Sequence, residues 1–155
     1  ANKKGVKLVR EKKYQEALGY LEKALQNSIN AGDDKLTLVC LHNLGSAQKF
    51  LKQYEAALQT LDTGLQKAAK LNQEIEQQLT PEILNNPKKK AEIAEPKNLA
   101  HIRNMKYHKV GCLKGLNRNK EADALAKELW QGGIAAKDTG LLEDLRKEGY
   151  DFGEN

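Results

Sequence analysis

Two histidines are the residues of this sequence whose side chains could carry metal or proton-transfer chemistry. His42 and His108 lie on separate segments with helical periodicity, where they could face each other as metal ligands or as a proton-transfer pair. Neither histidine belongs to a local motif with the spacing of metal ligands. Cys40 and Cys112 are also far apart and form no Cys-x-x-Cys motif, so they indicate neither a zinc site nor a disulfide framework. We expect both cysteines to be small buried or half-buried helix residues.

Other motifs that carry chemistry are missing from the sequence. It contains no glycine-rich phosphate loop, no nucleophile motif and no carboxylate pair that stands apart from the surface glutamates. Lys88, Lys89 and Lys90 form a basic run that is shorter than the clusters typical of nuclear targeting or nucleic-acid binding. We therefore predict a protein that is not an enzyme and that needs no metal or cofactor.

The composition is that of thin amphipathic helices. The chain has 155 residues, of which 30% are charged and only 5% aromatic, and its net charge is +5. No stretch approaches the ~18 apolar residues that a membrane span requires. We expect a soluble, intracellular protein in the cytoplasm. The sequence does not begin with Met and is already inside a repeat pattern at its first residues, so we also expect a processed chain or a piece of a longer protein.

An internal repeat organises the sequence. The segment from Tyr14 to Gln26 recurs from Tyr54 to Gln66, and the small and apolar residues keep a constant offset of 40 positions. Within each copy the apolar residues follow the three-then-four spacing of one helix face. The matching pairs are Gly5 and Gly45, Tyr14 and Tyr54, Ala17 and Ala57, Leu18 and Leu58, Leu21 and Leu61, and Leu25 and Leu65.

This repeat predicts an all-α protein of about three helical hairpins and a short final helix. Gly32 ends the first hairpin, and Gly132 with Gly133 ends the third. Thr80 and Pro81 mark a new start after a long helix that extends to about Gln78. We predict repeat 1 at about 1–31, repeat 2 at about 34–79, an exposed insertion at about 80–97, repeat 3 at about 98–131 and a capping helix at about 138–149. Trp130 is expected to pack against that capping helix.

The small residues at the predicted helix crossings resemble those of the tetratricopeptide repeat (TPR) family. The run from Leu41 to Gly45, followed by Tyr54, Ala57, Leu58 and Leu61, carries the resemblance. It covers residues 1–70 well and 98–130 loosely. The 40-residue period exceeds the usual 34 and is similar to the long-helix repeats of kinesin light chains and spindle-orientation adaptors. The resemblance implies a right-handed α-solenoid in which the first helix of each hairpin lines a concave groove that receives a peptide or a partner helix.

The resemblance also implies which residues face that groove. They are the residues two, three and six positions before, and one and four after, a crossing glycine, which we take to be Gly5, Gly45 and Gly111. Asn43 is of special interest because its amide can both donate to and accept from a peptide backbone. The predicted partner-binding residues are Asn2, Lys3, Val6, His42, Asn43, Ser46, Lys49, His108, Lys109 and Cys112; Val9, Val39, Met105 and Gly115 hold further positions of the pattern.

The function implied by the resemblance is protein recognition. We predict a scaffold or adaptor that binds a peptide or helix of a partner protein, one carrying acidic side chains, within a larger protein or multiprotein assembly. One alternative is permanent packing against other subunits through the convex side and the long second helix. A second is a peptide-sensing regulator, in which ligand binding closes the superhelix. A third is a basic helical-repeat module for nucleic acid, whose phosphate contacts would be Lys3, Lys49, Lys88 to Lys90, Arg103 and Lys109.

Overall fold

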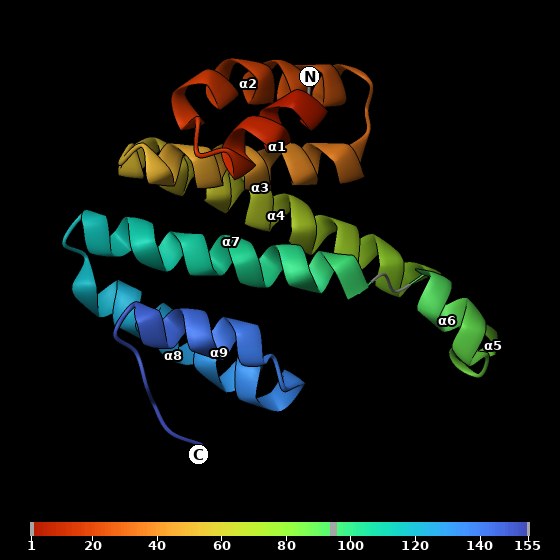
Figure 1. Cartoon of the computed structure of the whole chain (residues 1–155). Coiled ribbons are helices and arrows are strands. Elements are labelled where there is room, and N and C mark those ends of the chain that lie inside the picture. The colour runs from red at the N-terminus through yellow and green to blue at the C-terminus, as the bar shows by residue number, and fades with distance from the viewer. Residues whose placement is uncertain (1, 94–95, 155) are drawn as a thin grey trace.

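The chain forms a stack of helical hairpins (Figure 1). The structure is a computed structural model that describes residues 2–93 and 96–154. Ala1, Ala94 and Glu95, which belong to the predicted first repeat and insertion, lie outside the described residues. The described helices are α1 (Asn2–Arg10), α2 (Tyr14–Asn30), α3 (Asp34–Phe50), α4 (Tyr54–Gln78), α5 (Pro81–Leu84), α6 (Pro87–Ile93), α7 (Pro96–Gly115), α8 (Asn119–Ala136) and α9 (Thr139–Lys147).

Three hairpins make up the stack, namely α1–α2, α3–α4 and α7–α8, and α9 packs against the last of them. The first helix α3 contacts α2, α4 and α7, while α7 contacts α3, α4 and α8. The short helices α5 and α6 pack mainly on each other and project from the far end of α4 (Figure 1). The predicted all-α, TPR-like stack with a final capping helix is therefore confirmed.

The turn inside each hairpin has one and the same geometry. Lys12, Lys52 and Asn117 adopt the left-handed conformation with φ of 59°, 60° and 60°. In each turn the next residue donates its backbone N–H to a carbonyl one turn earlier in the first helix, at 2.8 to 2.9 Å. This is the usual way of ending a helix with a left-handed residue. Equivalent positions are therefore 40 residues apart between the first two hairpins and 65 apart between the second and third.

The two helices of a hairpin cross where one side chain is very small. A Cβ atom on Gly5 would lie 2.7 Å from Leu21 Cδ2, and one on Gly45 would lie 2.6 Å from Leu61 Cδ2. The turn register places Val110 and Ala126 at the equivalent positions of the third hairpin, and both are fully buried. In the first two hairpins the larger residue of the pair is on the second helix, whereas in the third hairpin it is Val110 on the first helix. Each crossing therefore still pairs one larger with one small side chain.

This register corrects our assignment of Gly111 as the third crossing glycine. The crossing position is Val110, and Gly111 lies one residue further along α7. A Cβ atom on Gly111 would lie 2.5 Å from Lys49 Cε, so this glycine allows α7 to approach α3 and not α8. Every groove position that we predicted in the third repeat is displaced by one residue as a consequence.

The third hairpin also ends later than we predicted. Gly132 and Gly133 lie inside α8, which continues to Ala136 and stops at Lys137, a residue with φ of 55°. Gly133 is buried, and a Cβ atom on it would lie 3.0 Å from Leu142 Cδ2. The glycine therefore serves the close packing of α9 and does not end the helix.

The predicted insertion contains helices. The long α4 ends at Gln78 as predicted, and Thr80 caps α5 by accepting a hydrogen bond from the backbone N–H of Ile83, with Pro81 in the first turn. The segment that we took for an exposed connector forms α5 and α6, and α7 begins at Pro96, inside the predicted insertion. In α5 only Ile83 is half-buried and the other residues are exposed. Lys88, Lys89 and Lys90 are exposed as well.

The C-terminal end of the stack is closed by α9 and the residues after it. Leu141, Leu142 and Leu145 bury themselves in one core with Trp130, which confirms the predicted packing of Trp130 on the capping helix. The Trp130 indole N–H donates to the carbonyl of Gly153 at 2.6 Å, and Phe152 lies edge-on to the indole ring. The tail thus folds back over the outer flank of α8.

The crossings lead to a test by exchange of side chains. We expect Gly45→Val to destabilise the protein by about 1–3 kcal/mol, because the added methyl groups overlap Leu61. Adding Leu61→Ala recreates the Val–Ala pair of the third hairpin, so the double variant should be more stable than the sum of the single changes by about 0.5–3 kcal/mol. Urea unfolding measures both quantities.

Gly19→Val is the matched control for this test, because nothing lies within 4 Å of a Cβ atom at that exposed position of α2. Two results would contradict this account of the packing. One is that Gly45→Val costs no more stability than Gly19→Val; the other is that the effects of the changes at positions 45 and 61 are strictly additive.

Candidate functional site

The first helices α1, α3 and α7 present a continuous row of equivalent positions. They contact one another directly, whereas the principal packing pairs of the described residues include no pair of second helices. The first helices therefore lie closer together than the second helices do. We define the first-helix face by the groove pattern in the corrected register, and its residues are Asn2, Lys3, Val6 and Val9 of α1, Val39, His42, Asn43, Ser46 and Lys49 of α3, and Asn104, Tyr107, His108, Gly111 and Lys114 of α7.

Asn2 and Asn43 connect α1 to α3 on this face. The Asn43 amide nitrogen lies 3.5 Å from Asn2 Oδ1, at the outer limit of a hydrogen bond, and Cys40 Sγ lies 3.9 Å from the same oxygen. Asn43 makes no other side-chain hydrogen bond within the part of the chain that the structure describes. Because a carboxamide has two donors and one acceptor oxygen, Asn43 keeps most of its hydrogen-bonding capacity for another molecule.

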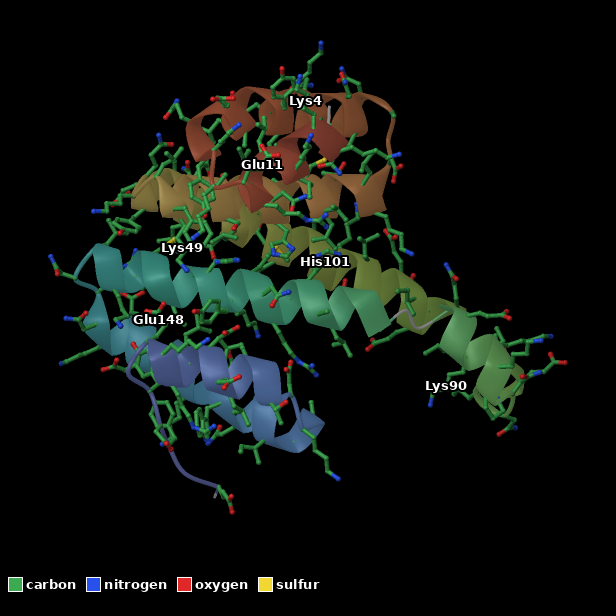
Figure 2. The ribbon with its side chains drawn as sticks, viewed as in Figure 1. Lys4, Glu11, Lys49, Lys90, His101 and Glu148 are labelled. Carbon is green, nitrogen blue, oxygen red and sulfur yellow. The ribbon has the colours of Figure 1, made fainter. Side chains whose placement is uncertain are left out.

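Two histidine contacts connect α3 to α7. His42 Nδ1 lies 2.9 Å from His101 Nδ1, and Lys49 Nζ lies 3.3 Å from His108 Nδ1. Residues 42 and 49 are seven apart on α3, and residues 101 and 108 are seven apart on α7, so the two helices meet in register over two turns. Figure 2 shows Lys49 and His101 at the two ends of this contact.

The geometry constrains the proton positions of these rings. Two Nδ1 atoms share a hydrogen bond only if one carries the proton and the other is bare, so one of His42 and His101 donates and the other accepts. The Lys49 ammonium donates to His108 Nδ1, which requires an unprotonated nitrogen there. Burial lowers the pKa of His42 to about 4, with His101 adding to the effect. Burial, Lys49 and His42 together lower the pKa of His108 to about 3.

Lys49 is held by aromatic rings as well as by His108. Its Nζ lies 4.9 Å from the Tyr107 ring centre and 5.2 Å from the Phe50 ring centre, within the range of cation–π attraction. Burial lowers the Lys49 pKa, and the negative charges of Asp144 on α9 and of Glu148, just after α9, oppose that shift. The half-buried ammonium therefore lies within electrostatic reach of α9.

Hydrogen bonds and one ion pair connect α7 to Glu148, the residue that follows α9. Tyr107 Oη donates to Glu148 at 3.3 Å, and burial with the nearby Glu148 and Asp144 charges raises the Tyr107 pKa to about 12. Lys114 Nζ donates to the backbone carbonyl of Glu148 at 2.8 Å. Lys49 and Lys114 occupy equivalent positions of their hairpins, and each reaches the next first helix along the stack. The face is thus held by polar contacts at every step from α1 to α9.

Two of the predicted site residues lie elsewhere. Cys112 is fully buried with Met105 in the core between α4 and α7, where burial raises the Cys112 pKa to about 11. Lys109 forms an ion pair of 2.8 Å with Asp62 of α4. In the corrected register the groove positions of Lys109 and Cys112 pass to their neighbours His108 and Gly111. Gly115, also in the predicted pattern, packs against Tyr54 and is replaced by Lys114.

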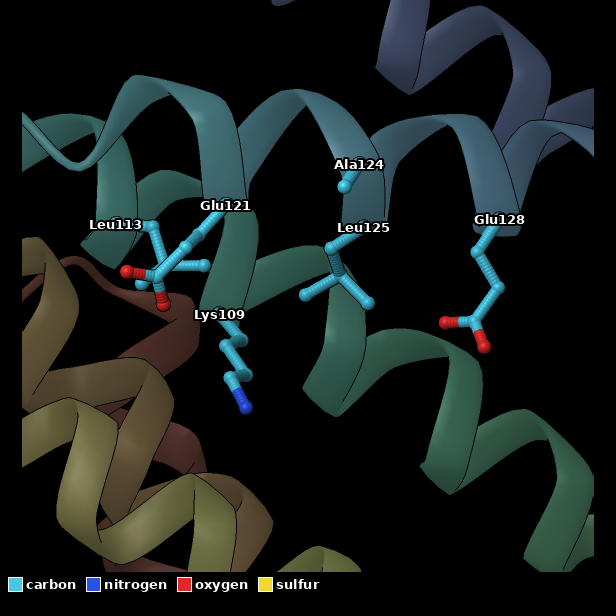
Figure 3. A pocket seen from close by; sticks show the side chains of 6 residues that line it. All are labelled: Lys109, Leu113, Glu121, Ala124, Leu125 and Glu128. Carbon is cyan, nitrogen blue, oxygen red and sulfur yellow. The ribbon is translucent and has the colours of Figure 1, made fainter.

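Lys109 belongs instead to a cleft of about 450 Å³ between α7 and α8 (Figure 3). Leu113 and Leu125 supply its apolar lining, and Glu121 and Glu128 stand at its edge. The carboxylates are already paired, since Arg118 binds Glu121 at 2.7 Å and Lys106 binds Glu128 at 3.5 Å. The cleft offers no free charge to a ligand.

Our sequence analysis missed His101, Tyr107, Lys114 and Asn104 as residues of this region. His101 was detectable, because it precedes His108 by the same seven residues that separate His42 from Lys49. The other three follow from placing the crossing at Val110, which only the turn geometry shows. The remaining predicted residues Asn2, Lys3, Val6, His42, Asn43, Ser46, Lys49 and His108 do share the first-helix face, and their contact with a partner stays a prediction.

The described ranges offer neither a metal site nor a membrane span. Within residues 2–93 and 96–154, no group of three or more His, Cys, Asp or Glu side chains is arranged to hold a metal ion. No helix in those ranges combines the length and the apolar character that crossing a bilayer requires. The Nδ1 atoms of His42 and His101 contact each other, and Nδ1 of His108 contacts Lys49, so these ring nitrogens have a structural role.

Comparison with known families agrees with this architecture. Residues 2–70 match the tetratricopeptide repeat family. The match spans α1, α2, α3 and most of α4, which are the two hairpins with glycine at the crossing. Tetratricopeptide repeat domains generally mediate protein–protein interactions and are usually not catalytic. Neither the curated proteins nor the solved structures contain a match to the chain. The likeness to kinesin light chain repeats stays a prediction.

The lowered histidine pKa values lead to a pH test. His42 and His108 are neutral in the folded state, while the unfolded chain binds protons below the ordinary value of 6.5. The contribution of these two histidines to the free energy of unfolding is therefore fully present above pH 6.5 and is lost as the pH falls from there toward about 3 to 4. Replacing both residues by glutamine should flatten this part of the profile, by about 2–3 kcal/mol for each histidine at pH 4.5.

Urea unfolding at several pH values between 8 and 4.5 measures this effect. The variant and the wild type are compared as slopes against pH, so a constant loss of stability from the substitution itself cancels. Parallel profiles for the two proteins would show that the imidazoles are not the groups responsible.

Proposed function

We propose that the chain is a protein-interaction scaffold whose first-helix face binds a peptide or helical segment of a partner protein, as a domain or subunit of a larger assembly. The tetratricopeptide repeat match supports a protein partner. The observation that carries the proposal is a row of equivalent positions in three successive hairpins that bears partly exposed Asn, Lys, His and Tyr side chains between a few valines, where core positions bear mainly Leu and Ala.

The face is ordered before a partner arrives. The contacts from Asn2 to Asn43, from Lys49 to His108 and from Tyr107 to Glu148 hold four helices in fixed positions. Binding then orders only the incoming segment, which reduces its entropic cost. Asn43 supplies donors and an acceptor for a peptide backbone, and Lys49 supplies positive charge for an acidic side chain.

The nucleic-acid alternative finds less support. The cations named for it do not form one surface, because Lys109 is paired with Asp62 and Arg103 with Asp138, while Lys49 is half-buried against rings. Lys88 to Lys90 lie on α6, which projects away from the stack (Figure 1). Nucleic-acid binding needs clustered, accessible positive charge along a phosphate path.

Selection from a displayed library of random peptides tests the proposal directly. Peptides that bind the wild type should lose at least about tenfold in affinity for the Asn43→Ala, Lys49→Glu double variant, because a backbone clamp and a charge are removed together. Fluorescence anisotropy of the selected peptides gives the affinities.

The matched control is Gln26→Ala with Lys23→Glu, which makes the same two kinds of change on exposed positions of the second helix α2. Circular dichroism at 222 nm confirms that both variants keep their helices. Peptides that bind both variants as tightly as the wild type would place the binding surface away from the first-helix face.

A further inference from the structure

The positive charge of the chain is concentrated at one end of the stack. Residues 1–13 contain six basic residues and one acidic residue, an excess of +5, and this equals the net charge of the whole protein. The other 142 residues contain equal numbers of basic and acidic residues. All seven charged side chains of residues 1–13 are exposed.

Only part of this charge is neutralised locally. Glu11 lies 4.0 Å from Lys7 and 3.5 Å from Lys13, and Lys4 lies over the Tyr20 ring. Lys3 and Arg10 form no ion pair with any residue that the structure describes. Lys3 is on the first-helix face at the position equivalent to Asn43 and His108, and Arg10 is equivalent to Phe50 at the end of the first helix.

The opposite end of the stack is acidic. Residues 138–155 contain six acidic and two basic residues. Asp144 is exposed, has no ion-pair partner among the described residues, and acts electrostatically on Lys49 and Tyr107 of the first-helix face. Glu148, which directly follows α9, contacts Tyr107 and Lys114. Figure 2 shows Glu148 on the side of α7 that faces α9, with Lys4 and Glu11 at the other end of the stack.

We infer that the first-helix face takes a charge-polarised protein segment in one orientation, with its acidic end over α1 and its basic end over α9. This inference rests on the proposed function and adds the charge pattern and direction of the partner. The middle of the face, from Asn43 to His108, then receives the less charged centre of the segment, where Lys49 offers one half-buried ammonium.

The spacing of the helices gives the length of that segment. Neighbouring packed helices lie about 8–10 Å apart, which sets the steps from α1 to α3 and from α3 to α7. With a third step of similar length from α7 to Glu148, which Tyr107 and Lys114 bridge, the distance from α1 to the acidic end is roughly 25–30 Å. An extended chain covers about 3.3–3.6 Å per residue, so the acidic and basic groups should be separated by roughly eight residues. A uniformly acidic segment would meet Asp144 and Glu148 at its far end, and repulsion there would cost it affinity.

Block peptides of about twelve residues, with glutamates at one end, lysines at the other and a Gly-Ser centre, test this inference. At about 50 mM salt they should bind about threefold to tenfold more tightly than all-glutamate or all-lysine peptides of equal length, and the difference should shrink with added salt. A nitroxide label on the acidic end should broaden the amide resonances of α1, and one on the basic end those of α9.

Charge-reversal variants of the protein provide a second test of the orientation. Lys3→Glu with Arg10→Glu, and separately Asp144→Lys, should each weaken block-peptide binding about threefold to tenfold. The controls make the same changes of charge on exposed residues of second helices, Lys23→Glu with Lys127→Glu and Glu22→Lys, and should leave binding unchanged.

Several outcomes would overturn the inference. One is that a nitroxide label on either end of the peptide broadens the resonances of α1 and α9 equally. A second is that uniform peptides bind as tightly as block peptides, and a third is that no block peptide perturbs the first-helix face. If library-selected peptides still occupy the face without charge polarity, the proposed function stands and the orientation alone is wrong.

Two other occupants of the charged ends are tested in parallel. Concentration-dependent assembly that disappears in the Lys3→Glu, Arg10→Glu variant would mean that the basic and acidic ends of two copies meet each other. Displacement of the block peptide by an oligouridine that also requires Lys3 and Arg10 would assign the basic end to nucleic acid. Light scattering and competition anisotropy give these answers, and either result would replace the inference.

Discussion

The close crossing of the two helices in each hairpin is the constraint on which the rest of the structure depends. Gly5 with Leu21 and Gly45 with Leu61 allow one large side chain to fill the space that the glycine leaves. Val110 with Ala126 reaches the same result with the sizes exchanged. What the fold fixes is the combined volume at the crossing, as expected for interiors packed to the density of organic crystals. Any mismatch there would tilt the second helix and displace the next hairpin.

The crossings determine what the first helices present. Because the hairpins stack in register, equivalent residues of α1, α3 and α7 come to one side and touch across each step, and Tyr107 of α7 reaches Glu148 at the end of α9. The contacts are polar but mostly uncharged in the middle of the face, where the neutral imidazoles surround one half-buried ammonium. Unpaired charge remains at the two ends, on Lys3, Arg10 and Asp144. The face is therefore rigid in the middle and electrostatically distinct at each end.

The sequence predicts the first two hairpins well because their glycines, leucines and turns repeat at a constant offset. It predicts the third hairpin one residue out of register, since its small crossing residue is Ala126 on the second helix and Gly111 is a misleading neighbour. A one-residue error rotates each position by about 100° around the helix, enough to replace Tyr107 and Gly111 of the face by Lys109, which pairs with Asp62 of α4, and Cys112, which lies in the core. Gly132 and Gly133 were misjudged for a related reason: a glycine that admits a neighbouring helix has the same sequence appearance as one that ends its own.

The extra helices between the second and third hairpins show why the stack tolerates a change in repeat length. The offset between hairpins grows from 40 to 65 residues, yet α7 still packs on α4. Its position is set by side chains: Met105 Sδ would lie 2.7 Å from a Cβ atom on Gly64, and Met105 shares a core with Leu38 and Ala68. Connection length adds little to the free energy once such contacts exist, because the cost of closing a loop grows only with the logarithm of its length. Since α5 and α6 project from the end of α4, the longer connection leaves the first-helix face uncovered (Figure 1).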